Sequence, residues 1–390
     1  MNYVADLLIV GGGPAGLSLA ILARQMGLSA AVFEAVKFPR ICHGDTLPAG
    51  IGQYFEMLGI SRQRLYRNAL PYTSHRLRWN SEEELVTKLG DEKGTVNEGL
   101  TITREFLEPM LMERARELGA AILQPCVVSK LITKDERICG VSTDKGIFEG
   151  RFVVDAAGSH HWLARKLGIA VDFYSPPLHG YYNWARGHCQ VCHDCPLIYD
   201  DATGWTWISR VEEPDLYQFT RLAFKPLENF RDWLPPEFIE AKMLPIGPTR
   251  GADMTWRIVS QPAGPGYFMI GDAVRRNDPM TNRGFELALV DAFKVALLLS
   301  RWKRGEVDGD EMAASYVSDV KDYYLKGLTP SYQFLSGHPL APDWLNGDRM
   351  YYRRALLSGR IPVLMRNFQV RQSRNPAEAA PIVSSKGNAH

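Results

Sequence analysis

The stretch Asp6-Leu-Leu-Ile-Val-Gly-Gly-Gly-Pro-Ala-Gly16 lies at the start of a 390-residue chain and decides its fold. It predicts a buried strand, a tight glycine turn and the start of a helix. In such a unit Gly11 permits the turn and Gly13 lets the backbone approach a pyrophosphate. Gly16 lets the helix pack closely on the strand.

The helix that follows the turn predicts an anion site at its N-terminus. Pro14 and Ala15 fall in the first helical turn, where a proline N–H is not needed. The free N–H groups and the dipole of the helix favour a negative group. A second strand, Ala30 to Glu34, ends in a carboxylate 18 residues after Gly16. This carboxylate suits ribose hydroxyls and argues against a 2′-phosphate, so the unit predicts a dinucleotide site.

A second glycine-containing segment lies far along the chain. It reads Tyr267-Phe-Met-Ile-Gly-Asp272 and continues to Asp278-Pro-Met-Thr-Asn-Arg-Gly284. With both segments in this order, the chain resembles the glutathione-reductase-type flavoproteins, in the branch of aromatic hydroxylases and flavin-dependent halogenases. The resemblance implies FAD, bound at both ends. It also implies an α/β fold, in which a Rossmann-like FAD-binding domain carries an inserted antiparallel β-sheet substrate domain and a C-terminal helical region.

The resemblance assigns residues to the flavin half of the cofactor. The carboxylate of Asp272, which follows Gly271, is expected at the ribityl chain, and Pro279 is expected near the ring. The helix that begins at Gly284 and Phe285 is expected to aim its N-terminus at the pyrimidine end of the ring. Reduced flavin carries negative charge there, which a helix N-terminus stabilises.

Other segments similar to the family supply the rest of the expected FAD site. Residues 37–46 resemble the loop that passes over the flavin, with Arg40 placed to reach phosphate. In the helix expected over 103–119, Thr103 would act as the cap and Arg104 matches an arginine that contacts the cofactor. Val128, on the following strand, would present its backbone to adenine.

The segment Phe152-Val-Val-Asp-Ala-Ala-Gly-Ser159 resembles the Asp-x-x-Gly element of the family. NADPH-using aromatic hydroxylases carry Asp-Gly where this chain has Ala157-Gly158. The difference disfavours direct nicotinamide binding. We therefore expect a separate flavin reductase or electron donor as a partner.

Composition excludes several classes of function. The chain is 45% hydrophobic and 23% charged, with a net charge of +1. This is typical of a soluble enzyme of two domains and argues against nucleic acid as a partner. No run of about 20 apolar residues predicts a membrane span, and no signal peptide is recognised, so we expect a cytoplasmic protein and no membrane partner.

Three of the six cysteines cluster in His188-Cys-Gln-Val-Cys-His-Asp-Cys195. Cys-x-x-Cys spacing suits zinc, but no second pair follows at a fitting distance. We expect free thiols and no bound metal. A redox role or contact with a partner protein are the alternatives.

The chain is expected to divide into discontinuous parts. We assign residues 1–72, 100–172 and 257–305 to the FAD-binding domain, and residues 73–99 and 173–256 to the substrate sheet. Residues 306–371 are expected to be mostly helical, and residues 372–390 to form a flexible tail.

The segment Gly204-Trp-Thr-Trp-Ile-Ser-Arg210 resembles the Trp-x-Trp-x-Ile-Pro motif of flavin-dependent halogenases, with Ser209 in place of the proline. On a strand, Trp205 and Trp207 point to the same face. They are expected to wall the substrate cavity beside the flavin. The alternative is a pair of tryptophans that only pack together.

Halogenases also need a lysine, and the stretch that resembles the lysine-bearing segment, residues 71–79, holds His75, Arg76 and Arg78 but no lysine. The absence of this lysine disfavours halogenation. We therefore expect a monooxygenase that hydroxylates an electron-rich aromatic through a flavin C4a-hydroperoxide. Candidates for proton transfer are His43 and Asp45, on the loop expected near the flavin. Each could instead be a loop residue that bonds only to backbone.

One run narrows the resemblance further. Asp253-Met-Thr-Trp-Arg-Ile-Val259 is similar to the flavoproteins that mature tryptophylquinone cofactors. This implies hydroxylation of a tryptophan in a partner peptide or protein, with O2 as co-substrate, during cysteine tryptophylquinone biogenesis. The rivals are a tryptophan or pyrrole halogenase, a geranylgeranyl-reductase-like oxidoreductase and a non-enzymatic flavin-bearing assembly factor.

Overall fold

The computed structural model describes residues 3–40, 45–81, 83–90, 97–337, 341–346 and 350–357. Its first sheet has the strand order β20-β21-β11-β1-β2-β8, with β10 and β9 added beside β11. β1 pairs in parallel with both β2 and β11. The strands are β1 (Tyr3–Val10), β2 (Ala30–Phe33), β8 (Ala121–Leu123), β9 (Val128–Lys134), β10 (Arg137–Thr143), β11 (Gly146–Asp155), β20 (Ala263–Gly264) and β21 (Tyr267–Met269).

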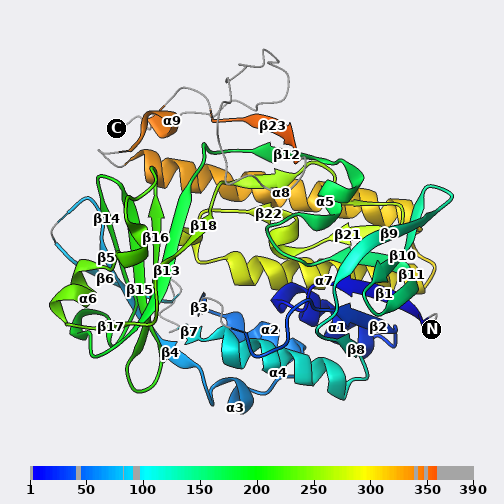
Figure 1. Cartoon of the computed structure of the whole chain (residues 1–390), viewed down its shortest axis with the longest axis horizontal. Coiled ribbons are helices and arrows are strands. Elements are labelled where there is room, and N and C mark those ends of the chain that lie inside the picture. The colour runs from blue at the N-terminus through cyan, green and yellow to red at the C-terminus, as the bar shows by residue number, and fades with distance from the viewer. Residues whose placement is uncertain are drawn as a thin grey trace, which may run out of the picture. The chain divides into compact units, whose positions relative to one another are not determined.

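The continuous apolar run of β1 is explained by burial on both faces. Leu7, Leu8 and Ile9 are fully buried between the helices that cover the sheet. α1 (Pro14–Gln25) packs against α4 (Arg104–Glu117) and α7 (Gly284–Lys303), and α7 packs against α8 (Gly309–Ser336). Figure 1 shows α7 running along this layer from the middle of the described fold.

A second eight-stranded sheet has the order β17-β13-β16-β15-β14-β5-β6, with β18 also pairing with β13 (Figure 1, green and cyan strands at the left). Its long central strands are antiparallel and alternate their faces, so residues two apart share a face. The strands are β5 (Ser74–Arg78), β6 (Leu85–Lys88), β13 (His179–Arg186), β14 (Leu197–Asp201), β15 (Gly204–Glu212), β16 (Leu216–Ala223), β17 (Leu244–Pro245) and β18 (Arg250–Asp253).

Two smaller sheets complete the described part. The first joins β3 (Asp45–Leu47), β7 (Gly99–Ile102) and β4 (Leu70–Tyr72). The second joins β22 (Arg275–Arg276), β19 (Arg257–Val259), β12 (Ala170–Phe173) and β23 (Arg353–Leu356). The short helices are α2 (Ile51–Met57), α3 (Arg62–Leu65), α5 (Trp162–Leu167), α6 (Pro236–Glu240), α9 (Asp343–Asn346), η1 (Gln190–Cys192), η2 (Phe230–Asp232), η3 (Gly271–Ala273) and η4 (Pro279–Thr281).

The α/β class with an added antiparallel sheet, expected from the sequence, is confirmed. The expected domain boundaries remain a prediction, although the strands of the second sheet all fall within residues 74–88 and 179–253. The region expected to be helical contains α8 and α9 but also β23, and the expected tail lies outside the described residues. Among the described helices, none has the length and apolarity needed to cross a membrane.

Candidate functional site

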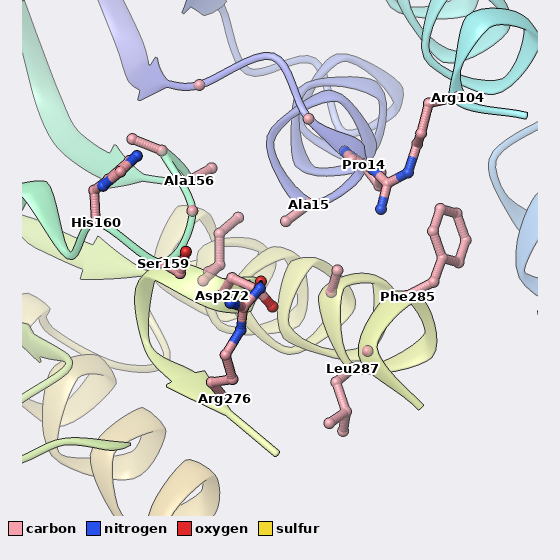
Figure 2. A pocket seen from close by; sticks show the side chains of 18 of the residues that line it. Pro14, Ala15, Arg104, Ala156, Ser159, His160, Asp272, Arg276, Phe285 and Leu287 are labelled. Carbon is pink, nitrogen blue, oxygen red and sulfur yellow. The ribbon is translucent and has the colours of Figure 1, made fainter. Parts of the chain in front are cut away.

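A cavity of about 950 Å³ is lined by both large sheets and by the first turns of α1 and α7. Figure 2 shows Pro14 and Ala15 at the start of α1, with Asp272 and the start of α7 facing them across the cavity. All the residues expected to bind the cofactor line it except Gly16. Two helix N-termini therefore point their free N–H groups at one long cavity.

The glycine turn has the close approaches that the sequence predicts. Gly11 has a φ of +109°, and a Cβ there would lie 2.3 Å from the carbonyl oxygen of Ala156. A Cβ on Gly16 would lie 2.1 Å from the carbonyl oxygen of Gly11. The absence of a side chain at Gly16 thus allows the helix to pack against the turn, and Gly16 itself does not line the cavity. At Gly13 the nearest atom to a Cβ is 3.8 Å away, so its backbone is open toward the cavity.

Glu34 directly follows β2, beside the glycine turn, and is only 5% exposed. Its Oε2 accepts a hydrogen bond from Gly12 N at 2.8 Å, and its Oε1 accepts one from Val36 N at 2.9 Å. Arg40 lies 3.4 Å from Oε1. The carboxylate therefore fixes the turn as well as lining the cavity.

Glu108 on α4 holds the two cavity arginines and was not singled out in the sequence. Its side chain is fully buried and accepts two hydrogen bonds of 2.7 Å from Arg40, with Arg104 at 3.4 Å. The guanidinium of Arg104 also lies over the ring of Phe285, 5.9 Å from its centroid. The i,i+4 spacing of Arg104 and Glu108 could have indicated their contact from the sequence. The contact with Arg40 could not be predicted in this way, because Arg40 is 68 residues away and no local pattern connects it to Glu108.

At the opposite end, Gly271 and Asp272 form the turn after β21. Gly271 has a φ of +63°, and its N–H donates to Asp291 Oδ2 at 2.8 Å. Asp291 Oδ1 accepts from the buried Arg275 at 2.9 Å. Asp272 lines the cavity and accepts from Arg276 at 2.7 Å. The buried Arg275–Asp291 pair thus holds the turn that presents Asp272.

The Asp-x-x-Gly element forms one wall of the cavity. Both oxygens of the buried Asp155 accept backbone N–H groups, from Ala157 at 2.9 Å and from Leu163 at 2.8 Å. Burial nevertheless raises the pKa of Asp155 to about 6. Nearby, burial and the Arg257 guanidinium lower the pKa of His161 to about 3.

The tautomer of His161 follows from its two partners. Its Nδ1 lies 2.8 Å from the carbonyl oxygen of Ala273, which can only accept. Its Nε2 accepts from Arg257 Nε at 2.8 Å. The ring is therefore neutral, with the proton on Nδ1, and it ties the segment after Gly158 to the segment after Asp272.

The second sheet supplies an aromatic and polar face to the cavity. Trp205 and Trp207 on β15 lie on one face, as expected, and both line the cavity. The neighbouring strands add Gln218 and Thr220 from β16 and Tyr182 from β13. The indole Nε1 of Trp207 and the side-chain oxygen of Gln218 are buried without a hydrogen-bond partner. A ligand with one acceptor and one donor group could satisfy both.

Several expected residues are placed differently or are not described. Thr103 occupies the N-cap position of α4, but its hydroxyl makes no cap hydrogen bond, so the expected side-chain cap is wrong. His43 lies outside the described residues, and only the backbone of Asp45 is described, in β3. The stretch compared with the halogenase lysine forms β4 and β5, and neither strand lines the cavity. In the described part, no lysine lines it either.

The cysteine cluster lies around η1, away from the cavity lining. Cys189 and Cys192 are buried thiols whose Sγ atoms are 3.1 Å apart. His188, His193 and Asp215 converge beside them. However, His193 Nδ1 lies 2.8 Å from Tyr217 Oη and its Nε2 lies 3.2 Å from Arg210, and the guanidinium opposes a cation. These contacts disfavour a metal at this cluster.

We expect Glu34→Ala to weaken FAD binding about 10- to 150-fold, the loss of one charged hydrogen bond of roughly 1.5–3 kcal/mol. Equilibrium titration with FAD and with FMN, which lacks the adenosine, separates the two roles of the carboxylate. Weaker binding of FAD alone indicates a contact with ribose. Equal weakening of both indicates that Glu34 acts through Gly12, and unchanged FAD affinity would contradict both roles.

Comparison with known proteins supports an FAD site. The model of the family described as "FAD binding domain" matches residues 4–232. The 1H-pyrrole-2-carbonyl-[peptidyl-carrier protein] brominase of Pseudoalteromonas luteoviolacea is 26% identical over 346 residues, 76% of this chain and 79% of the relative. The tryptophan 2-halogenase of Chondromyces crocatus is 23% identical over 347 residues, 82% of this chain and 66% of the relative.

Solved structures show the same fold. PqsL of Pseudomonas aeruginosa, described as a probable FAD-dependent monooxygenase, superposes with a TM-score of 0.71 at 19% identity. The match covers 85% of this chain and 95% of that one. The cavity described above therefore belongs to a fold that halogenating and oxygenating flavoproteins share.

Proposed function

Because the chain belongs to the FAD binding domain family, we propose that this FAD-dependent oxidoreductase is a monooxygenase that inserts oxygen into an electron-rich aromatic ring. The observation that carries the proposal is the cavity itself. One end has the glycine turn before α1 and the carboxylate of Glu34, and the other has an aromatic wall with unpaired polar groups. When bound and reduced, FAD supplies the activation of O2.

The residues present fit FAD along its length. Gly11 and Gly13 with the first turn of α1 would hold the pyrophosphate, Glu34 the adenosine ribose, and Val128 the adenine. Asp272 would hold the ribityl chain. Pro279 would lie beside the ring, and the start of α7 at Gly284 would face its pyrimidine end.

The finer proposal is an indole as substrate, presented by a partner peptide or protein in tryptophylquinone biogenesis. Trp205 and Trp207 form an apolar wall suited to stacking on an aromatic ring. The unpaired Trp207 N–H and Gln218 oxygen suit the carbonyl oxygen and the N–H of a peptide-linked tryptophan. His43 remains a proposed proton-transfer group from the sequence alone, as does Asp45.

Halogenation is the second candidate, supported by the two halogenating relatives. The lysine-free lining of the described cavity argues against it, because the resemblance implies that halogenases use a lysine beside the substrate. The two functions differ in their need for halide. We expect product to form at the same rate from reduced FAD-loaded enzyme with and without bromide. Product formation that requires bromide would establish the halogenase instead.

Replacing Trp207 by phenylalanine keeps a ring in the wall but removes the buried N–H. We expect KM for the aromatic substrate to rise about tenfold, the loss of one hydrogen bond of roughly 1–1.5 kcal/mol, with FAD affinity unchanged. Trp184→Phe, on β13 and outside the cavity lining, is the matched control and should leave KM unchanged. The measurement is the steady-state kinetics of both variants. If the KM of Trp207→Phe also equals that of the parent protein, Trp207 only packs in the wall and does not bond to the substrate.

A further inference from the structure

Asp278 is a buried carboxyl that the expected FAD contacts do not use. It lies between β22 and η4, immediately before Pro279, and lines the cavity. The residue is 2% exposed. Its Oδ1 accepts from Met280 N at 2.8 Å, whereas its Oδ2 is buried without a hydrogen-bond partner. In the described part of the chain, no arginine, lysine or histidine forms an ion pair with it.

The indole side chains of two tryptophans from other elements lie close enough to this carboxyl to lower its pKa. Trp205 comes from β15 and Trp256 from the segment before β19, and the Nε1 of each is buried without a completed hydrogen bond. Burial raises the pKa of Asp278 to about 7, although the Met280 N–H and the two indoles oppose that rise. The two indole donors are placed to stabilise a negative charge after a proton leaves.

The other ionisable groups near Asp278 are already engaged. On its own side, Arg275 is paired with Asp291, and Arg276 with Asp272. On α7, Glu286 does not line the cavity and is paired with Arg283. The facing sheet presents Trp205, Trp207, Gln218 and Thr220, and the side chains of these residues do not ionise near neutral pH.

We propose that Asp278 is an acid–base residue of the cavity, with its Oδ2 exchanging a proton with the aromatic substrate. The proposal rests on the monooxygenase function for the use of this proton. Overall, an aromatic C–H, O2 and the two electrons and two protons of reduced FAD give C–OH, water and oxidised FAD. As the ring carbon–oxygen bond forms and the C–H bond breaks, Asp278 Oδ2 takes the ring proton. It then returns the proton to the departing water.

A rival role is purely structural, with an ionised Asp278 clamping the two indoles. The two roles differ in the sign of their pH dependence. The pKa of an aspartate in the unfolded chain is about 3.9. A carboxyl whose pKa is higher than this in the folded state does not reduce the free energy of unfolding at a pH below about 3.9, because it is protonated in both states. The folded state then loses stability as pH rises to about 7, and the loss is constant above it. A clamp would instead gain stability as the carboxyl ionises.

The test uses FAD-loaded protein without substrate, so it does not depend on turnover. Infrared difference spectra across pH 5.5–8.5 should show a protonated carboxyl band that disappears near pH 7, separate from the signal of the buried Asp155, whose pKa is raised to about 6. Asp278→Asn should lack this band, whereas the exposed control Asp319→Asn should retain it. Denaturation should show that Asp278→Asn stabilises the protein more at pH 8 than at pH 5. A missing band, or greater destabilisation by Asp278→Asn at pH 8, would overturn the proposal.

Turnover provides the second readout. With saturating substrate, kcat of Asp278→Asn should fall about 100- to 10,000-fold, with its FAD affinity retained. The pH-dependent rise of kcat across neutrality should be lost in the variant. Asp278→Ser serves as a second variant should asparagine disturb the η4 turn. If the infrared band titrates but no aromatic product forms with the parent protein, the monooxygenase function fails while the proton-holding site stands.

Discussion

Alanine at Gly11 should abolish FAD loading. Gly11 has a φ of +109°, where an alanine is strained by about 1–2 kcal/mol. The added Cβ would lie 2.3 Å from the carbonyl oxygen of Ala156 and 2.9 Å from the Cα of Ala157, and both atoms are backbone. The strand and the wall of the cavity must separate to accept it, which misplaces the N–H groups at the start of α1.

The measurement is the flavin content of purified Gly11→Ala, read from its visible absorbance after incubation with excess FAD. Gly305→Ala is a matched control, because Gly305 has a φ of +73° but no atom within 4 Å of a Cβ. It tests backbone strain without the clash and should load FAD normally. Circular dichroism of the Gly11 variant separates lost binding from lost folding. Normal FAD content in Gly11→Ala would contradict the assignment of the pyrophosphate turn.

Removal of the Asp291 carboxylate should cost about 3–5 kcal/mol of unfolding free energy, because it leaves the guanidinium of Arg275 buried and uncompensated. The Arg275 and Asp291 side chains are 3% and 1% exposed. Two further nitrogens of Arg275 are already without partners, so no other described group replaces the lost contact. Asp291→Ala also frees the N–H of Gly271, and we expect weaker FAD binding at the Asp272 end.

Chemical denaturation of three variants tests this pair. Asp291→Ala should be strongly destabilised, whereas Asp291→Leu combined with Arg275→Met should recover much of the loss, because no buried charge remains. Asp319→Ala, at an exposed position on α8, should change stability little. A loss below about 1 kcal/mol for Asp291→Ala would mean that solvent reaches Arg275.

Local sequence patterns predicted the parts of the site that lie within one strand–turn–helix unit. The turn around Gly11, the carboxylate of Glu34 and the shared face of Trp205 and Trp207 each follow from spacing alone. Together with the second glycine segment, these patterns led to the FAD-binding fold, which the family match and the similar solved structures confirm.

The parts that escaped prediction depend on contacts between distant segments. Arg40 donates a hydrogen bond to Glu108, 68 positions away in the sequence, and Arg257 donates one to His161, 96 positions away. Asp278 was quoted within a motif, but only the fold shows that it is buried between two indoles. Thr103 fits a capping position by type, yet its hydroxyl does not bond there. Periodicity and turn rules describe residues that are close along the chain, and they carry no information on contacts between residues that are far apart in the sequence.

The central claim is that this cavity directs oxygen, rather than halogen, onto an aromatic ring. The most direct test is high-resolution mass spectrometry of a synthetic peptide with one tryptophan, after incubation with the protein, reduced FAD and isotopically labelled O2 in the presence of chloride and bromide. A matched peptide with phenylalanine in place of tryptophan is the control. We predict one labelled oxygen atom on the tryptophan and none on the control. A chlorine or bromine isotope pattern on the tryptophan, with no labelled oxygen, would contradict the claim.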